Sequence, residues 1–304
     1  MATSVPCIDC GTITDMPDLS FGVYVVPNGP EHGRDLALRM EDTDFDVAWI
    51  GDTLGDWRDR SSPLLDPWVT LGALATETED LELGMMVTNL AWRDPVHVAR
   101  FAMTVDQLSN GRFVLGLGCG QVDDQLMVGR ETYEMTAKER VDRLEEGTQV
   151  IDRLLRQDTS DFTGQFTQYE NAAMAPGCVQ TPRVPLALAG NGPRITKMAA
   201  RLADTWNAWI DITDIDEWRR QISERTSMLD DYLAEIDREP DSLTRSLLAF
   251  DEAFDAWSDP GAVPRLVEQF APLGFTEFIF YPPEPGEWTK FLKVGVDVLG
   301  SLRS

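Results

Sequence analysis

The sequence contains few positive charges and very little histidine. Its 304 residues hold 26 Lys and Arg against 52 Asp and Glu, which gives a net charge of −26, and only four of the cations are Lys. No basic stripe is present that could neutralise the phosphates of a nucleic acid, so DNA or RNA binding is excluded. The two histidines, His32 and His97, lie far apart in sequence, and we expect no metal site from them.

Long apolar runs are also absent. No stretch approaches the ~20 consecutive apolar residues that a membrane-spanning helix needs. The first residues contain neither the basic region nor the apolar core of a secretory signal. We therefore expect a soluble, cytoplasmic protein with no membrane partner.

Cysteine is scarce, and its spacing does not favour metal binding. Cys7 and Cys10 form a single CxxC ahead of the first predicted strand, while Cys119 and Cys178 each stand alone. A structural zinc site needs a second pair of ligands at suitable spacing. We expect reduced thiols, no metal, and an N-terminal arm over residues 1–20 followed by one domain over residues 21–304.

The surplus of acidic residues is dispersed along the chain. Nine Trp and thirteen Phe argue against a disordered acidic protein. Binding of basic ligands is one alternative, but adaptation of the whole surface to high salt explains a dispersed surplus better. At ~1 M salt the Debye length is about 3 Å, so repulsion between the acidic groups is largely screened. This pattern indicates a salt-loving source, which we interpret as an archaeon.

Eight short apolar segments alternate with eight helical segments. The predicted strands are residues 21–27, 46–51, 81–88, 112–118, 185–190, 205–210, 243–250 and 276–281. Asp–Pro pairs at residues 66–67, 94–95 and 259–260 are typical of helix starts, with Asp as the N-cap and Pro at the first helical position. The third helix has an apolar stripe at helical spacing, made of Val98, Phe101, Ala102, Val105 and Leu108.

Repeated strand–helix units imply parallel strands covered by helices. Eight units in one domain predict an α/β fold, a (β/α)₈ TIM barrel, whose active site lies at the C-terminal ends of the strands. Residues 157–184 interrupt the alternation and predict an insertion between the fourth and fifth strands. A doubly wound open sheet is the alternative, but the first predicted strand is not followed by the GxGxxG turn that this fold would favour.

Chemistry is expected where the predicted strands end. The glycine-bearing turn at residues 190–193 leads into a helix, whose first N–H groups and dipole suit a phosphate, although ordinary tight turns have the same composition. GLGCG at residues 116–120 would let a flat ring approach the backbone, or would serve tight strand packing. Asp52 follows the second strand, as a candidate site acid or as a partner in a loop salt bridge. A bulge is expected near Gly84–Met86.

Several long blocks resemble the luciferase-like monooxygenase superfamily. They are residues 66–120, residues 143–156 (RLEEGTQVIDRLLR), residues 162–166 (FTGQF) and residues 184–207 (VPLALAGNGPRITKMAARLADTWN), in the family's order and spacing. The resemblance covers about residues 21–300. It implies a barrel that holds coenzyme F420, a deazaflavin, or FMN, and that commonly forms a homodimer.

The resemblance also implies a set of site residues. The turn at residues 190–193 would hold the cofactor phosphate, and the third strand would back the ring, with a cis peptide at Met86–Val87. The implied cofactor-binding residues are Met86, Val87, Thr88, Gly118, Cys119, Gly120, Gly190, Asn191, Gly192 and Pro193. Asp52, Thr53 and Gln121 would lie near the ring as catalytic residues that polarise a small-molecule substrate or position a water.

Within the superfamily, several pieces resemble the F420-dependent methylenetetrahydromethanopterin reductases. Three positions depart from related enzymes: Tyr24 replaces an acid, Thr53 replaces a histidine, and Gln121 replaces a glutamate. Each departure removes a proton-transfer group. The resemblance therefore implies an F420-dependent oxidoreductase that transfers a hydride to or from a small substrate. An FMN-dependent monooxygenase and a cofactor-binding protein without catalysis remain the alternatives.

Overall fold

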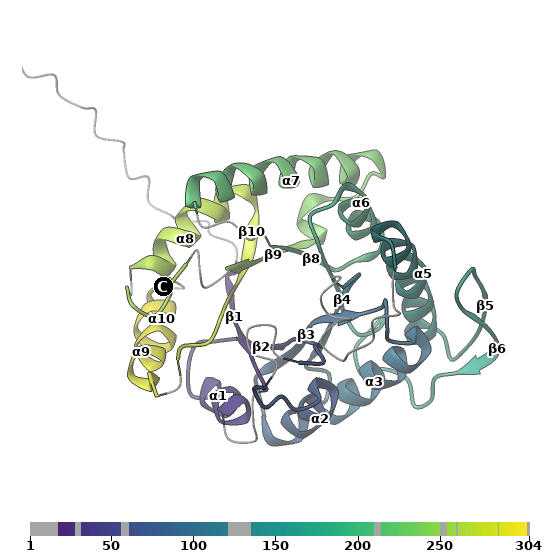
Figure 1. Cartoon of the computed structure of the whole chain (residues 1–304), viewed down its shortest axis with the longest axis horizontal. Coiled ribbons are helices and arrows are strands. Elements are labelled where there is room, and N and C mark those ends of the chain that lie inside the picture. Colours follow the sequence, from purple (N-terminus) through teal and green to yellow (C-terminus); the bar gives the residue numbers. More distant parts are fainter. Residues whose placement is uncertain are drawn as a thin grey trace, which may run out of the picture.

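The computed structural model describes residues 18–27, 32–55, 61–120, 135–209, 214–249, 254–259, 261–284 and 286–302. Gln121, Cys7 and Cys10 lie outside these residues. Eight parallel strands close into a barrel in the order β1-β10-β9-β8-β7-β4-β3-β2 (Figure 1). The predicted barrel and its eight strands are thereby confirmed. They are β1 (Ser20–Val25), β2 (Val47–Ile50), β3 (Glu82–Asn89), β4 (Phe113–Gly118), β7 (Leu186–Ala189), β8 (Thr205–Ala208), β9 (Thr244–Ala249) and β10 (Phe275–Phe280).

Helices form a ring around the strands (Figure 1). They are α1 (His32–Met40), α2 (Pro67–Glu77), α3 (Pro95–Leu108), α5 (Ala137–Arg156), α6 (Pro193–Leu202), α7 (Ile215–Glu235), α8 (Ala262–Phe270), α9 (Trp288–Leu292) and α10 (Leu299–Leu302). A π-helical segment, η3 (Lys293–Val298), joins the last two, and short 3₁₀ turns occur at η1 (Pro240–Ser242) and η2 (Ala271–Leu273). Among the described residues, none of the helices is long and apolar enough to cross a membrane.

Two of the three predicted Asp–Pro helix starts are confirmed. A side-chain oxygen of Asp66 accepts the N–H groups of Trp68 and Val69, each at 3.0 Å, and Asp94 caps α3 in the same way. The third prediction was wrong, because α8 begins at Ala262 with Gly261 as its N-cap. Asp259 instead accepts the N–H of Gly261 at 2.9 Å, which forms a turn before the helix begins.

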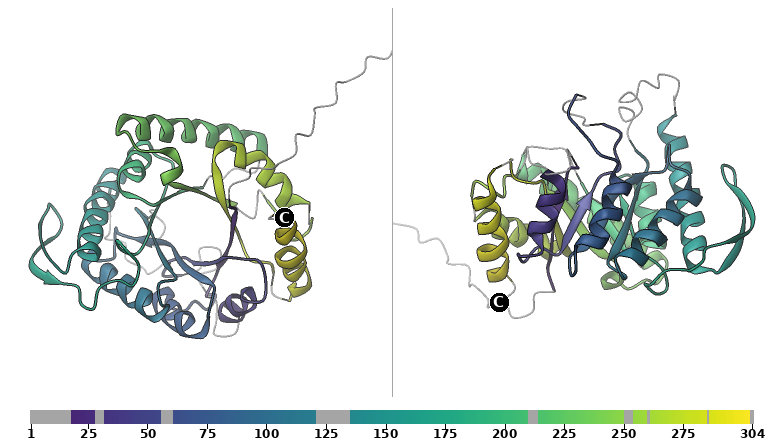
Figure 2. Two further views of the ribbon diagram at one scale, coloured as in Figure 1. Left: turned by 180° about the vertical axis from the view of Figure 1, so that it is seen from behind. Right: turned by 90° about the horizontal axis from the view of Figure 1, so that it is seen from below.

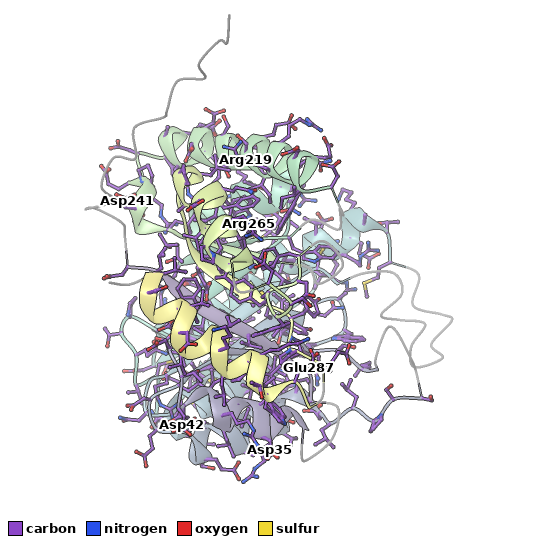
Figure 3. The ribbon with its side chains drawn as sticks, turned by 90° about the vertical axis from the view of Figure 1, so that its left-hand side faces the viewer. Asp35, Asp42, Arg219, Asp241, Arg265 and Glu287 are labelled. Atoms are coloured by element: carbon purple, nitrogen blue, oxygen red, sulfur yellow. The ribbon has the colours of Figure 1, made fainter. Side chains whose placement is uncertain are left out.

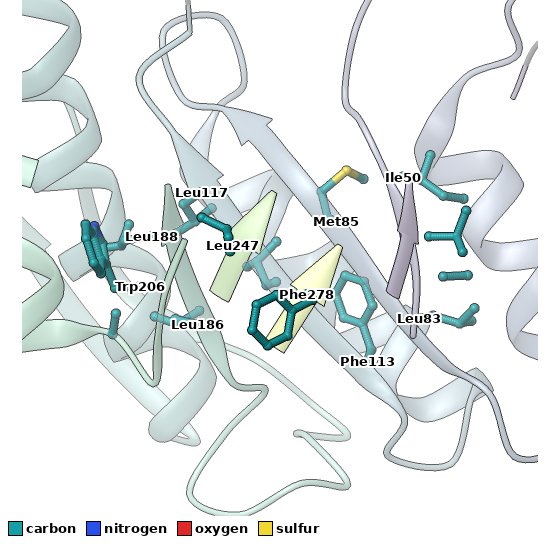
Figure 4. Close-up of a cluster of buried hydrophobic side chains, with 14 of the residues drawn as sticks. Ile50, Leu83, Met85, Phe113, Leu117, Leu186, Leu188, Trp206, Leu247 and Phe278 are labelled. Atoms are coloured by element: carbon teal, nitrogen blue, oxygen red, sulfur yellow. The ribbon is translucent and has the colours of Figure 1, made fainter. Parts of the chain in front are cut away.

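Strand side chains alternate between two apolar environments. One set faces the helices and forms the main core, as Figure 4 shows for Phe113, Leu188 and Phe278. The other set points into the barrel and forms a smaller interior cluster, made of Val47, Trp49, Met86, Ala187, Leu248 and Ile279. The predicted stripe of α3 needs one correction, because Phe101 and Leu108 are exposed while Val98, Ala102 and Val105 are buried.

The insertion at residues 157–184 contains an antiparallel hairpin, β5 (Thr159–Thr163) with β6 (Gln168–Ala173). It extends away from the helices beside α5 (Figure 2). The Glu146 carboxylate on α5 accepts the N–H groups of Gln165, Phe166 and Thr167 at 2.6 to 2.8 Å. Glu146 therefore fixes the turn of the hairpin to the barrel's outer helix layer.

Charged side chains cover the outer helices, as Figure 3 shows around Asp35, Asp42 and Glu287. Each of the four lysines lies on an outer helix and is paired with an acid. The pairs are Lys138–Asp142, Lys197–Glu235, Lys290–Glu287 and Lys293–Asp297. Exposed ion pairs of this kind contribute little to stability. Because acidic residues outnumber Lys and Arg by 52 to 26, the protein carries a net negative charge.

Candidate active site

The ends of β3, β4 and β7 meet at one end of the barrel. Asn89 at the end of β3 pairs with Gly118 of β4, and Leu117 of β4 pairs with Leu188 of β7. Because all eight strands are parallel, their C-terminal ends define one mouth, where barrel active sites are built. The predicted ring-backing strand and the strand that leads into the phosphate turn therefore lie on either side of β4 at this mouth.

The end of β3 is bulged, as the sequence predicted. Its register against β4 shifts between Met85 and Thr88, and the peptide bond Met86–Val87 is cis. The Met86 side chain is buried in the interior cluster, below the mouth. A Cβ on Gly118 would lie only 2.4 Å from Cγ2 of Val87. Gly118 therefore makes room for Val87. This is the tight strand packing that was one of the two explanations that the sequence allowed for the glycines of residues 116–120.

Two polar residues follow the bulge. Thr88 is fully buried, and its Oγ1 has no hydrogen-bond partner among the described residues. Asn89 Oδ1 accepts the N–H of Ala91 at 2.9 Å. Gly120 has φ +66°, and a Cβ there would lie 2.0 Å from Nδ2 of Asn89, so glycine is required beside this amide. Cys119 is half-buried between these elements.

The turn from β7 into α6 exposes backbone donors. Gly192 is the N-cap of α6, and no side chain caps this helix. A helix leaves its first N–H groups without intrahelical partners, and a Cβ on Gly192 would meet no atom within 4 Å. Asn191 Nδ2 donates to the carbonyl of Trp209, while its buried Oδ1 has no partner among the described residues. This geometry suits an anion with hydroxyl groups nearby.

Asp52 takes part in a buried ion pair. Its oxygens accept Arg93 Nε at 3.0 Å and Nη2 at 2.6 Å, and Trp68 Nε1 lies 3.4 Å from Oδ2. Burial raises the pKa of Asp52 above its ordinary value, and the Arg93 guanidinium opposes this shift. Thr53 Oγ1 donates to the carbonyl of Gly55 at 2.5 Å. The structure thus brings Asp52 and Thr53 to the end of β2, while their catalytic role stays a prediction.

An aromatic pair lies at the same end of the barrel. The rings of Tyr24, near the end of β1, and Tyr281, just after β10, are 5.1 Å apart and tilted by 32°. A Cβ on Gly51 would lie 1.7 Å from Oη of Tyr24, so the hydroxyl rests on this glycine. From the sequence, Tyr24 was named only because related enzymes have an acid at this position, and Tyr281 was not named. Both residues could have been found from the alternation of side chains along the two strands, which places them on the inward face.

A family model described as luciferase-like monooxygenase matches residues 17–250. The chain belongs to the luciferase-like monooxygenase family. An F420-dependent glucose-6-phosphate dehydrogenase of Amycolatopsis mediterranei is 32% identical over 180 residues, which cover 58% of this chain and 52% of the relative. The chain thus spans about half the length of this relative. An uncharacterized protein of Mycobacterium bovis is 30% identical over 227 residues, covering 74% and 72% of the two chains.

Solved structures show the same luciferase-like fold. An F420-dependent tetrahydromethanopterin reductase of Methanopyrus kandleri has a TM-score of 0.77 at 17% identity, covering 94% of this chain and 99% of its own. An F420-dependent secondary alcohol dehydrogenase, solved with an F420–acetone adduct, has a TM-score of 0.79 at 17% identity, covering 95% and 100%. At this identity the likeness establishes the fold alone.

The interior of this luciferase-like barrel holds an acid that the sequence did not reveal. Glu277 of β10 is buried, and its Oε1 accepts Trp49 Nε1 at 3.1 Å. Ser246 hydrogen-bonds the same carboxyl group, and Asn207 Nδ2 donates to Ser246 Oγ at 3.0 Å. Burial raises the pKa of Glu277 to about 7. From the local sequence, a charged residue in an apolar strand would be expected to face solvent. Only the pairing of β10 with its neighbours places Glu277 inside the barrel.

One cavity of about 390 Å³ lies away from the mouth, between α5 and the β5–β6 hairpin. Its acids are all occupied by partners: Asp142 and Glu145 pair with Arg194, and Glu146 binds the hairpin turn. The described residues contain no group of His, Cys, Asp and Glu that could hold a metal ion. Among the lining residues, Glu146 serves the attachment of the hairpin.

Proposed function

We propose that this chain is an oxidoreductase that binds coenzyme F420 and transfers a hydride between it and a small organic substrate. The turn into α6 is the observation that carries the proposal, because no side chain caps this helix, and its first N–H groups would bind an anion at the barrel mouth. Membership of the luciferase-like family and the F420-dependent names of several relatives support the choice of cofactor.

The polar groups present at the mouth fit this cofactor. Thr88 Oγ1 and Asn191 Oδ1 are buried without partners among the described residues, and the space beside Gly192 is open. A buried polar atom without a partner costs about 1–3 kcal/mol, which a ligand hydroxyl or ring edge would recover. We infer that these atoms bind polar groups of the cofactor.

Each candidate residue has a proposed part in binding. Residues 190–193, which are Gly190, Asn191, Gly192 and Pro193, would hold the phosphate. Met86, Val87 and Thr88 would support one face of the ring, and Gly118, Cys119 and Gly120 would lie along its edge. When bound, the deazaflavin carries the hydride, while the protein supplies orientation and electrostatics.

The residues around the ring would act on the substrate. Thr53 and Gln121 are proposed to polarise the reacting group or to position a water. Asp52, held by Arg93, would fix the loop after β2 in its place and so orient Thr53. The Tyr24 and Tyr281 rings would form an aromatic wall for a substrate of small size.

The test is a titration of the apoprotein with F420 and with FMN, followed by fluorescence quenching. Turnover is then measured on alcohols, aldehydes, a pterin and glucose 6-phosphate. Tight F420 binding with hydride transfer to or from any of them supports the proposal. Preference for FMN with oxygen consumption favours the monooxygenase alternative. Binding without turnover on the whole panel favours a cofactor-binding protein without catalysis.

We also propose that the protein works as a homodimer in a salt-rich cytoplasm, consistent with an archaeal source. Val69 on α2 and Phe101 and Leu108 on α3 are 74%, 37% and 47% exposed, and the two helices are adjacent. We propose that these exposed apolar side chains contribute to the interface between the two copies. Cys119 and Cys178 are free thiols, which suits a reducing compartment. Sedimentation at molar salt, with Val69→Glu as the interface variant, tests the dimer.

A further inference from the structure

The Trp49 indole lies in a cradle of two glycines inside the barrel. A Cβ on Gly22 of β1 would be 2.7 Å from its Cδ1, and a Cβ on Gly84 of β3 would be 2.2 Å from its Cε3. Trp49 is only 1% exposed. The indole therefore fills the space that the two glycines leave free.

Glu277 anchors the polar edge of this indole. Trp49 Nε1 donates to Oε1 of Glu277 at 3.1 Å, and the chain continues through Ser246 to Asn207. Ser246 and Asn207 are both buried. Four strands, β2, β8, β9 and β10, thus contribute one polar side chain each to a single buried chain of hydrogen bonds. Such a chain fixes its members strongly when it is fully satisfied.

The anchored indole is in contact with the mouth. Trp49 and Met86 belong to one interior cluster, against which Tyr24, Val87 and Tyr281 pack. Met86 and Val87 are the residues proposed to support the cofactor ring. A displacement of the indole would therefore be transmitted to that surface through close-packed side chains.

We propose that Glu277 is a positioning residue, whose gain or loss of a proton changes how Trp49 is held and thereby sets the affinity of the barrel mouth for its cofactor. The identity of that cofactor rests on the proposed function. The control of Trp49 by Glu277 stands on the geometry alone.

The protonation change occurs near neutral pH. Burial raises the pKa of Glu277 to about 7, while the hydrogen bonds from Ser246 and Trp49 oppose the shift. Two acids near the other end of the barrel, Glu82 on β3 and Asp46 before β2, raise the pKa further. A ligand that covers the mouth excludes water and favours the neutral acid. Cofactor affinity should therefore fall as the pH rises through about 7.

The first experiment uses the ligand-free protein at constant molar salt. Tryptophan fluorescence and near-UV circular dichroism are followed over about two pH units on either side of the transition. The expected result is a transition near pH 7 in the wild type, absent in Glu277→Gln and in Trp49→Phe. Glu277→Gln keeps the acceptor for the indole, so it should fold. Glu82→Gln should retain the transition but move it to lower pH.

The second experiment measures the dissociation constant of F420 at both ends of this range. If binding raises the pKa of Glu277 by one unit, affinity should fall about tenfold across the transition. In Glu277→Gln the affinity should be the same at both ends. A transition that persists in Glu277→Gln, or a wild-type affinity that does not change with pH, overturns the proposal. If F420 fails to bind at any pH, the proposed function fails, and the ligand-free titration alone decides whether Glu277 controls Trp49.

Discussion

Arg93 binds both carboxylate oxygens of Asp52, with Nε 3.0 Å from Oδ2 and Nη2 2.6 Å from Oδ1. The Asp52 side chain is fully buried and that of Arg93 is 23% exposed. Arg93 also lies 3.5 Å from Asp66, the N-cap of α2. One guanidinium thus joins the end of β2, the start of α2 and the loop before α3.

Arg93→Ala should destabilise the protein by about 3–5 kcal/mol, because it leaves the Asp52 charge buried without a partner. Asp52→Asn should cost less, about 1–3 kcal/mol, since the Arg93 guanidinium that remains is partly exposed and still lies 3.5 Å from Asp66. Because burial already raises the pKa of Asp52, the loss in Arg93→Ala should shrink at acidic pH, where the lone carboxyl is protonated. Urea unfolding at constant salt measures the stability of the wild type, Arg93→Ala and Asp52→Asn at neutral and at acidic pH. Equal losses at neutral and acidic pH would show that the charge is not the cause.

Gly118→Ala should disturb the bulge of β3. The new Cβ would lie 2.4 Å from Cγ2 of Val87, and overpacking of this kind costs about 1–3 kcal/mol. Val87→Ala in the same chain should restore most of the stability. Gly72→Ala is the matched control, because a Cβ there meets no atom within 4 Å, and alanine should stabilise α2 by up to about 1 kcal/mol. Thermal unfolding of the wild type and these three variants tests the prediction. An unchanged melting temperature in the single variant Gly118→Ala would contradict this packing.

The strands of the barrel could be read from the sequence, because buried parallel strands are short continuous apolar runs. Residues 112–118 and 205–210, for example, become β4 (Phe113–Gly118) and β8 (Thr205–Ala208). The helix caps at Asp66 and Asp94 were equally readable, since their partners lie two and three residues away. The start of α8 was not, because Asp259 forms a turn with Gly261 instead of a cap.

Residues of the site whose partners are distant in sequence could not be predicted. Arg93 lies 41 positions from Asp52, and Trp49 lies 228 positions from Glu277. No local pattern encodes such pairs, because only closure of the barrel brings them together. The turn at residues 190–193 and the bulge of β3 were found because glycines and a family resemblance mark them within short segments.

Stability should rise as salt increases toward molar concentration. The net charge of −26 and the four paired lysines leave a surface of like charges, and at ~1 M salt the Debye length falls to about 3 Å. Repulsion in the folded state is then screened. The melting temperature is measured from low to molar sodium chloride. A melting temperature indifferent to salt over this range would contradict the prediction.

Glu277→Gln should change how stability depends on pH. The pKa of Glu277 is raised from 4.5 to about 7, so the folded state binds more protons than the unfolded state between these values. The wild type should therefore lose stability relative to Glu277→Gln as pH rises from about 4.5 to 7 and stay constant above it. The difference should reach about 3 kcal/mol, at 1.36 kcal/mol per pKa unit. Parallel unfolding curves at every pH for the two proteins would refute it.

Gly192→Asp should strengthen the fold and weaken cofactor binding at the same time. Gly192 is the N-cap of α6, and its Cβ position is open, so an aspartate fits without a clash. Its carboxylate should accept the free N–H groups of the first turn and stabilise the helix by up to about 1 kcal/mol. Those are the donors proposed to bind the cofactor phosphate, and the added charge repels it, so F420 affinity should fall by at least about tenfold, or 1.4 kcal/mol. Gly192→Ala is the control, because it fills the same space without an oxygen and should bind F420 nearly as well as the wild type. A raised melting temperature with unchanged F420 affinity in Gly192→Asp would place the phosphate elsewhere.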